Sequence, residues 1–258
     1  MTHLSLIKTI LLSVAVISSQ MLWADNFEFD RPGQALGTGI VPKGHLAWEQ
    51  SLPAFTYDEY RVDGVKHQEM TAQSDILLRV GIGSDTELRL SWDGPMWQQH
   101  KAGGIKDKID GVGDIQVGIK KSISLEDDKL KWALLAQVNL ATGDDEFTSD
   151  EEIYTLGSSL SYQFSQDITT GMTMLYDYQD GNLAWTAIPN ITYPVAGKVS
   201  GFSEYVFRKA EHQHSESVVN TGLVWNVLDN LQLDASIGYS FNRQQPQLNA
   251  GLGVAYLF

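Results

Sequence analysis

The last eight residues of the chain, GLGVAYLF (251–258), alternate between two kinds of side chain. Leu252, Val254, Tyr256 and Phe258 occupy every second position, with glycine or alanine between them. A period of two is typical of a β-strand, whose successive side chains point to opposite faces. Chain ends in soluble domains are usually frayed, so this apolar ending predicts a strand that is paired up to Phe258.

The same alternation recurs along the chain in segments of about ten residues, the length of a tilted strand that crosses a bilayer. One face of nearly every segment is apolar: Leu88, Leu90 and Trp92, for example, alternate with Glu87 and Arg89. No long stretch has a helical period. We predict twelve strands, at approximately residues 45–57, 68–82, 86–94, 111–123, 131–141, 153–164, 168–178, 183–194, 198–208, 218–227, 231–241 and 248–258.

The connections between these segments alternate between short and long. Tight turns are expected at 83–85, 126–128, 165–167, 196–198 and 228–230, and longer loops at 58–67, 94–110, 143–152, 209–217 and 242–247, with 179–182 as a short exception. Outer-membrane barrels have short periplasmic turns and longer outside loops. The pattern therefore predicts an all-β, antiparallel up-and-down barrel of the transmembrane, outer-membrane type, over residues 45–258.

Alternation alone does not say which face is inside, because a soluble ligand-binding barrel places its apolar face inward. The polar face is rich in glycine, which weakens a strand exposed to water but makes room for long neighbours inside a lumen. Aromatic residues of the apolar face fall at the two ends of the strands, as in the girdles of a membrane barrel. Arg79 and Arg89 avoid the apolar face, where a basic residue costs about 2–4 kcal/mol at mid-depth. We therefore expect the polar face to line the lumen.

Composition excludes several function classes. A formal net charge of -14 makes nucleic acid a poor partner. The absence of cysteine excludes disulfides and thiolate metal sites. Residues 1–24 contain one charged side chain, Lys8, and a short apolar core before Ala24, which predicts a secretory signal peptide. A membrane anchor is the alternative, but the uncharged run of residues 9–24 is shorter than the ~20 residues that a spanning helix needs.

Charged residues on the polar face are the candidate site. The functional interpretation is a solute pathway whose charges select solutes, and the alternative is a set of salt bridges that fills a narrow barrel. Residues 25–44 precede the first strand and either remain in the periplasm or enter the lumen as a plug. The candidate lumen residues are Glu49, Asp75, Arg79, Arg89, Asp93, Asp114, Lys120, Glu204, Arg208 and Asp234.

Other polar features carry weaker signals. The acidic stretch GDDEFTSDEE (143–152) lacks the glycine-marked order of a calcium loop, so a solvated loop is favoured. His212 and His214 lack a third ligand for a transition metal. His45 and His67 cannot be tied to a serine nucleophile. Pro189 removes a ladder hydrogen-bond donor and suggests a bulge. We predict no catalytic residue, no metal site and no cofactor.

Several stretches resemble a known family in the same order: DRPGQALGTGIVPKGHLAWE (30–49), LLRVGIGSDTELRLSWDG (77–94), GVGDIQVGIK (111–120), LLAQVNLATGD (134–144) and LDNLQLDASIGYSFN (228–242). The chain is similar to the outer-membrane transporters named after the meta-pathway of phenol degradation. The resemblance covers nearly all of the chain after the signal peptide. It implies a barrel in the outer membrane of a Gram-negative cell and uptake of aromatic compounds. It supplies no catalytic motif, and Ala141-Thr142 departs from the family's usual proline.

Together these observations predict a passive channel for small, aromatic or hydrophobic, solutes, with cations preferred over anions. The alternatives are a barrel enzyme that acts on lipid or lipopolysaccharide, and a structural barrel that transports nothing. The expected partners are outer-membrane lipid and lipopolysaccharide, a small-molecule solute, and the barrel assembly machinery through the C-terminal Phe258.

Overall fold

The computed structural model of the chain describes residues 27–241 and 247–258. The predicted signal peptide, residues 1–24, lies outside the described residues. Within them, no helix is long and apolar enough to cross a membrane. The strands are β1 (Leu46–Val62), β2 (Val65–Gln73), β3 (Ile76–Gly81), β4 (Thr86–Trp92), β5 (Pro95–Ala102), β6 (Ile105–Val112), β7 (Ile115–Ile123), β8 (Leu130–Leu140), β9 (Ile153–Gln163), β10 (Thr169–Gln179), β11 (Asn182–Ala196), β12 (Val199–Ala210), β13 (Glu216–Leu228), β14 (Leu231–Ser240) and β15 (Gln247–Leu257).

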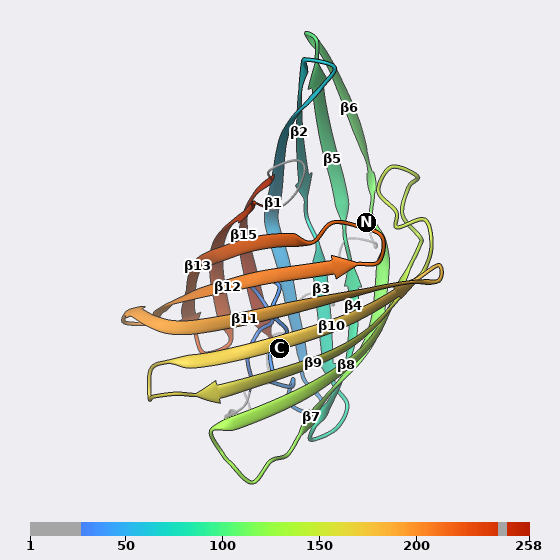
Figure 1. Cartoon of the computed structure of the whole chain (residues 1–258). Coiled ribbons are helices and arrows are strands. Elements are labelled where there is room, and N and C mark those ends of the chain that lie inside the picture. Colours follow the sequence, from blue (N-terminus) through green and yellow to red (C-terminus); the bar gives the residue numbers. More distant parts are fainter. Residues whose placement is uncertain (1–26, 242–246) are drawn as a thin grey trace, which may run out of the picture.

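These strands form one closed antiparallel barrel (Figure 1). Three of its twelve wall strands are each divided in two by a short break, giving the pairs β2 and β3, β4 and β5, and β6 and β7. The last strand pairs with the first, with Trp48 opposite Tyr256 and Ala47 opposite Leu257. The backbone N–H of Phe258 donates to the carbonyl oxygen of Leu46 at 2.8 Å. The twelve-stranded barrel and the pairing of the C-terminal strand are thus confirmed.

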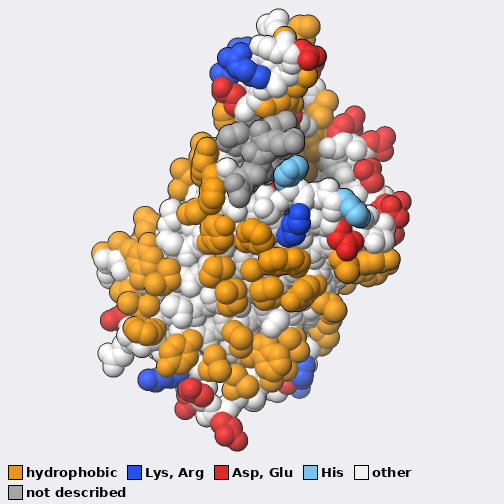
Figure 2. Space-filling model, viewed as in Figure 1, with side chains coloured by type: hydrophobic (Ala, Val, Ile, Leu, Met, Phe, Trp, Pro, Cys, Tyr) orange, Lys and Arg blue, Asp and Glu red, His pale blue; other side chains and the backbone are white. Residues whose placement is uncertain are grey.

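The faces of the barrel are inverted relative to a soluble domain. Among the largest fully buried side chains are Arg79, Lys120, Glu49 and Glu87, whereas Leu156 is 64% exposed on the outside. Figure 2 shows apolar side chains in a broad band across the barrel wall, with charged side chains gathered beyond it. An outside of this kind suits acyl chains, and strand closure leaves no backbone edge unsatisfied in lipid. The expectation that the polar face lines the lumen is confirmed.

The predicted long loops 58–67 and 94–110 consist mostly of strand residues, so these loop boundaries were wrong. β1 continues to Val62 and turns through Asp63 and Gly64, both at positive φ, while residues 95–112 form the hairpin of β5 and β6 around Gly103 and Gly104. Both faces of these portions are partly polar, so no apolar stripe marks them as strands. Figure 1 shows that residues 54–73 and 95–112, here called the extension, rise well beyond the rest of the barrel.

The strand pairing contains irregularities that the sequence placed wrongly or did not show. β1 has a register shift between Ser51 and Ala54, and this shift inverts which residues face inward above it. Pro189 was expected to cause a bulge, but Ala187 pairs with Phe207 and Asn190 with Glu204 in one unbroken register. On the other side of β11, Met172 pairs with Pro189 without a register shift, since the proline removes only one N–H donor.

Candidate solute pathway

Residues 27–44, here called the luminal segment, run through the inside of the barrel. Their backbone N–H groups donate to side chains that point inward from four different strands. Arg31 N donates to Glu49 Oε2 at 2.9 Å, Gln34 N to Glu204 Oε1 at 2.7 Å, Leu36 N to Thr173 Oγ1 at 3.1 Å and Val41 N to Glu87 Oε2 at 2.9 Å.

These contacts explain how a segment without regular secondary structure is stable inside the barrel. Buried backbone donors need partners, because an unpaired one costs about 1–3 kcal/mol. The lumen supplies carboxylates and hydroxyls as acceptors, and charged acceptors make stronger hydrogen bonds than neutral ones. The inward carboxylates Glu49, Glu87 and Glu204 therefore act as anchors for this backbone.

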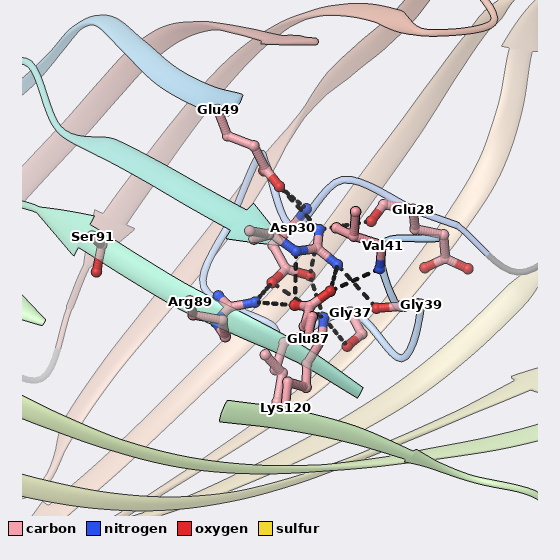
Figure 3. Close-up of polar contacts among 12 residues, drawn as sticks. Glu28, Asp30, Gly37, Gly39, Val41, Glu49, Glu87, Arg89, Ser91 and Lys120 are labelled. Atoms are coloured by element: carbon pink, nitrogen blue, oxygen red, sulfur yellow. Dashed lines mark hydrogen bonds and ion pairs between the residues drawn. The ribbon is translucent and has the colours of Figure 1, made fainter. Parts of the chain in front are cut away.

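The densest of these contacts form a buried charge cluster, defined here as Asp30, Glu49, Arg79, Glu87, Arg89 and Lys120 (Figure 3). Arg79 lies at its centre, with Nη1 2.9 Å from Glu49 Oε1 and Nε 2.9 Å from Glu87 Oε1. Arg89 forms an ion pair with Asp30 and lies 3.0 Å from Glu87. Lys120 Nζ is 3.2 Å from Asp30. The three acidic and three basic groups balance one another.

Strand register explains why the cluster needs a residue of the luminal segment. Arg79 lies directly opposite Arg89 in the β3–β4 ladder, and like charges placed opposite each other are destabilising. Asp30 enters between Arg79, Arg89 and Lys120 and compensates them. Burial alone would raise the pKa of the Asp30 carboxyl, but these three cations lower its pKa below the usual range. Asp30 is therefore ionised at neutral pH.

The opposite side of the lumen holds the segment less densely. Glu204 accepts hydrogen bonds from Gln34 N, Ala35 N and Asn220 Nδ2. The guanidinium of Arg31 lies 3.4 Å from Asp234 of β14 and 3.5 Å from Asp75, which stands between β2 and β3. Arg31 therefore links two different strands of the barrel wall. Gly253 leaves room for the Arg31 side chain, since a Cβ there would overlap its guanidinium. The expectation that inward glycines accommodate long neighbours is confirmed here.

Two cavities lie against the luminal segment, and Arg31 and Pro32 line both. One, of about 650 Å³, faces β9–β14 towards their short-turn ends. Its polar lining includes Ser161, Asn190 and Thr192, and Phe29 and Phe202 supply rings. The other, of about 350 Å³, lies towards the extension. Arg31 and Pro32 thus separate two chambers inside one barrel.

The remaining predicted lumen residues lie apart from the cluster. Asp75, Asp93 and Asp114 occupy the three breaks between paired half-strands. Asp114 accepts from Asn139 Nδ2, Thr142 N, Gly143 N, Thr148 Oγ1 and Ser149 N, at 2.8–2.9 Å, so it fastens the loop after β8. Arg208 pairs with Asp177 at 3.5 Å and lines a further cavity near the loops.

Sequence reasoning did not single out Asp30 and Arg31 as site residues. Both stand in the DRPG stretch (30–33) of the segment 25–44, which was expected either to remain in the periplasm or to enter the lumen as a plug. The stretch has the residues of a turn and charges of both signs. That mixed charge was the available signal, because an acidic and a basic residue side by side suit a lumen that carries both signs.

The weaker candidates stay apart from the luminal contacts. His45 Nδ1 bonds the carbonyl oxygen of Phe258 at 2.8 Å, and His67 bonds His100 at 3.0 Å. Across residues 27–241 and 247–258, neither histidine is hydrogen bonded to a serine, and no group of three metal-ligating side chains is assembled. The six carboxylates of the 143–152 loop are exposed, as expected for a solvated loop.

Several solved structures share this architecture at low sequence identity. An outer-membrane channel from Pseudomonas putida F1 matches with a TM-score of 0.64 and 9% identity over 88% of this chain and 99% of that one. The translocator domain of the autotransporter NalP from Neisseria meningitidis matches at 0.55, with 15% identity over 83% and 88%. The KdgM porin in complex with oligogalacturonate matches at 0.52, with 13% identity over 79% and 98%. These likenesses establish an outer-membrane barrel fold.

Sequence comparison identifies the family. No curated protein matches the chain. Residues 29–258, which include the luminal segment from Phe29 onward and the whole barrel, match one family model. The chain belongs to the family described as "Putative MetA-pathway of phenol degradation".

Proposed function

We propose that this protein is an outer-membrane channel for the passive passage of small solutes, and that the luminal segment closes it in the state described. The observation that carries the proposal is a closed barrel with a polar lumen that holds a chamber on either side of Arg31 and Pro32. Among the described residues, the luminal segment and the buried charge cluster around Asp30 obstruct this lumen. No energy source or cofactor is needed for passive diffusion.

The chamber linings indicate the class of solute. The larger chamber combines hydroxyl and amide groups with the rings of Phe29 and Phe202. Glu28, Asp30, Glu204 and Asp229 line the same chamber, against the one guanidinium of Arg31. A neutral or cationic solute that carries a ring and hydroxyl groups fits these surfaces better than an anion. The family description points to aromatic compounds of the same kind.

Closure depends on the luminal segment in this proposal. Asp30 and Arg31 are adjacent in sequence but are held by different groups, Asp30 by three cations and Arg31 by Asp75 and Asp234. Loss of both side-chain attachments would leave the part of the segment that separates the chambers held by backbone hydrogen bonds, such as those to Glu49 and Glu204, so it would leave its place more often. The barrel wall itself needs no rearrangement, because its strands pair with one another independently of the segment.

The proposal includes the route to the membrane. We infer export by the signal peptide to the outer membrane of a Gram-negative cell, with Phe258 as the residue that the assembly machinery recognises. The enzyme alternative has weaker support, since His45 and His67 bond a backbone carbonyl and another histidine. The alternative of a structural barrel makes the opposite prediction for conductance.

Planar bilayer conductance tests the proposal. The refolded protein is compared with the double variant Asp30→Asn/Arg31→Gln, and Lys198→Gln in the tight turn between β11 and β12 serves as the control. We expect small, infrequent steps for the wild type and the control, and larger steps with cation preference for the double variant. A sealed membrane with all three folded proteins contradicts the channel. Equal conductance of all three contradicts closure by the segment.

A further inference from the structure

Basic residues gather on the outward face of the extension. They are Arg61, Lys66, Lys101, Lys106 and Lys108, here called the basic patch, and all five are exposed. The chain has 18 basic residues against 32 acidic ones, so a concentration of five on one face is opposite to the overall charge. Figure 2 shows these blue side chains near the tip of the extension, with a few red side chains beside them.

Strand register places like charges of the patch directly opposite each other. Arg61 pairs with Lys66 in the β1–β2 ladder, and Lys101 pairs with Lys106 in the β5–β6 ladder. Such an arrangement is destabilising unless a counter-charge is present. Glu59 supplies one to Lys66, at 2.8 Å. Among the residues that the structure describes, no carboxylate lies within ion-pair distance of Lys101, Lys106 or Lys108.

The patch borders a hollow that has room for a ligand group. A cavity of about 280 Å³ is lined by Tyr57, Gln68, Glu69, Met70 and Gln99 together with Lys101 and Lys106. The lining therefore has two cations against one carboxylate, with apolar and amide groups beside them. This shape favours a bound anion with adjoining apolar or sugar surface over a single free counterion.

The position of the basic patch relative to the lipid-facing residues indicates which anion it binds. Phe55 and Trp97 lie on the same outward face below it, and both are exposed apolar residues of the kind that contacts lipid. Lys101 lies four residues beyond Trp97 on the same strand, which is about 13 Å at 3.3 Å per residue. Beyond Trp97 the outward-facing residues of β5 are Gln99 and Lys101, so we place Lys101 in the headgroup region of the outer leaflet.

We propose that the basic patch binds the phosphate groups of lipopolysaccharide in the outer leaflet. The phosphates would lie between Lys101 and Lys106 and relieve their repulsion, while the sugar backbone covers the hollow beside Tyr57 and Met70. Phe55 and Trp97 then contact the acyl chains of the same molecule. Basic residues near an anionic membrane surface attract its headgroups within about a Debye length. This interaction would fix the orientation of the extension and is independent of whether the lumen conducts.

Titration of the full-length refolded protein in non-ionic detergent with purified lipopolysaccharide tests this proposal. The variant is Lys101→Glu/Lys106→Glu. The matched control, Lys129→Glu/Lys198→Glu, makes the same charge change in two tight turns at the other end of the barrel. We expect the first variant to bind on the order of tenfold more weakly or worse, since each basic residue at a membrane surface contributes measurably. The control should bind like the wild type.

Two further arms make the result specific. Dephosphorylated lipopolysaccharide should bind the wild type as weakly as intact lipopolysaccharide binds the Lys101→Glu/Lys106→Glu variant. Loss of the heat-induced shift in gel mobility would identify a variant that has not folded, and Lys101→Gln/Lys106→Gln would then replace it. Equal binding by wild type and folded variant, an equal loss in the control, or binding that ignores dephosphorylation would each overturn the proposal.

Discussion

The two sides of the lumen hold the luminal segment in different ways. The side formed by β1, β3, β4 and β7 presents Glu49, Arg79, Glu87, Arg89 and Lys120, which are buried and in mutual contact. The side formed by β9–β14 presents mainly hydroxyl and amide groups and leaves a cavity of about 650 Å³. The first side fixes the segment, and the second leaves space beside it.

The difference follows from the cost of desolvation. A buried charge is tolerated only when it is paired and hydrogen bonded, so the charged side must surround Asp30 completely. Hydroxyl and amide groups cost less free energy to desolvate than charged groups do, and water can supply their hydrogen bonds. Small polar side chains such as Ser159 and Thr173 therefore need only a light contact, here with the backbone of Leu36. A lumen built from both kinds of surface can hold a segment and keep a chamber open.

The largest expected effect comes from breaking the charged side. Arg79→Gln should lower the free energy of unfolding by about 3–5 kcal/mol, because it leaves the buried Glu49 without its cation and removes one of the three cations around Glu87. Urea titration of the refolded protein in detergent measures it. Arg208→Gln, which removes an ion pair at 3.5 Å from a half-exposed side chain, should cost less than about 1 kcal/mol. Comparable losses in the two variants would show that the cluster has no special role.

A smaller effect is expected where the luminal segment leaves the lumen and approaches β3. Lys43 forms a bridge with Gly81, and a Cβ at Gly81 would overlap the carbonyl oxygens of Val41 and Pro42. Gly81→Ala should therefore displace the segment at a cost of about 1–3 kcal/mol, as for other overpacked sites. Because the chain has no cysteine, Ala35→Cys can report the displacement as faster thiol labelling.

Gly83→Ala is the matched control for that substitution. A Cβ at Gly83 meets its nearest neighbour, Thr86, at 3.6 Å, which is an ordinary contact. Labelling of the Ala35→Cys reporter should be unchanged in this variant. If Gly81→Ala also leaves the labelling rate unchanged, the close approach of Val41 and Pro42 does not hold the segment.

The smallest effect should come from the less charged side. Glu204→Gln keeps one acceptor oxygen but loses the charge that strengthens the bonds from Gln34 and Ala35. We expect a loss of about 1 kcal/mol, the difference between charged and neutral hydrogen bonds, again read from urea titration and thiol labelling. A loss as large as that of Arg79→Gln would mean that both sides hold the segment equally.

The fold was largely predictable from sequence because the membrane imposes a simple rule. Leu88, Leu90 and Trp92 face lipid while Glu87 and Arg89 face inward, and the same parity appears in strand after strand. Prediction failed where that rule stops. Most of residues 95–112 lie beyond the apolar band, where both faces carry polar side chains, so the hairpin was taken for a loop. The register shift between Ser51 and Ala54 coincides with Pro53, whose missing N–H is a bulge signal that the sequence interpretation did not use.

The candidate site was only half predictable. Parity placed Arg79, Arg89, Lys120 and Glu204 on the inward face, since a charge on the lipid side is costly. The alternation of inward and outward side chains does not show which inward residues contact one another, because that depends on the stagger between neighbouring strands. Asp114 illustrates the limit: it was grouped with the lumen charges, yet its carboxylate fastens the loop after β8.

The sequence by itself determined the closed twelve-stranded barrel, its orientation toward lipid and the pairing of the final strand, because alternation and charge avoidance are local properties that each segment carries. Only the tertiary structure decided that Asp30 pairs with three cations of the barrel wall while Arg31 pairs with Asp75 and Asp234. It also decided that Lys101 lies opposite Lys106. Those contacts arise between residues far apart in the chain, or from turn and register geometry, and the stagger of the closed barrel brings them together.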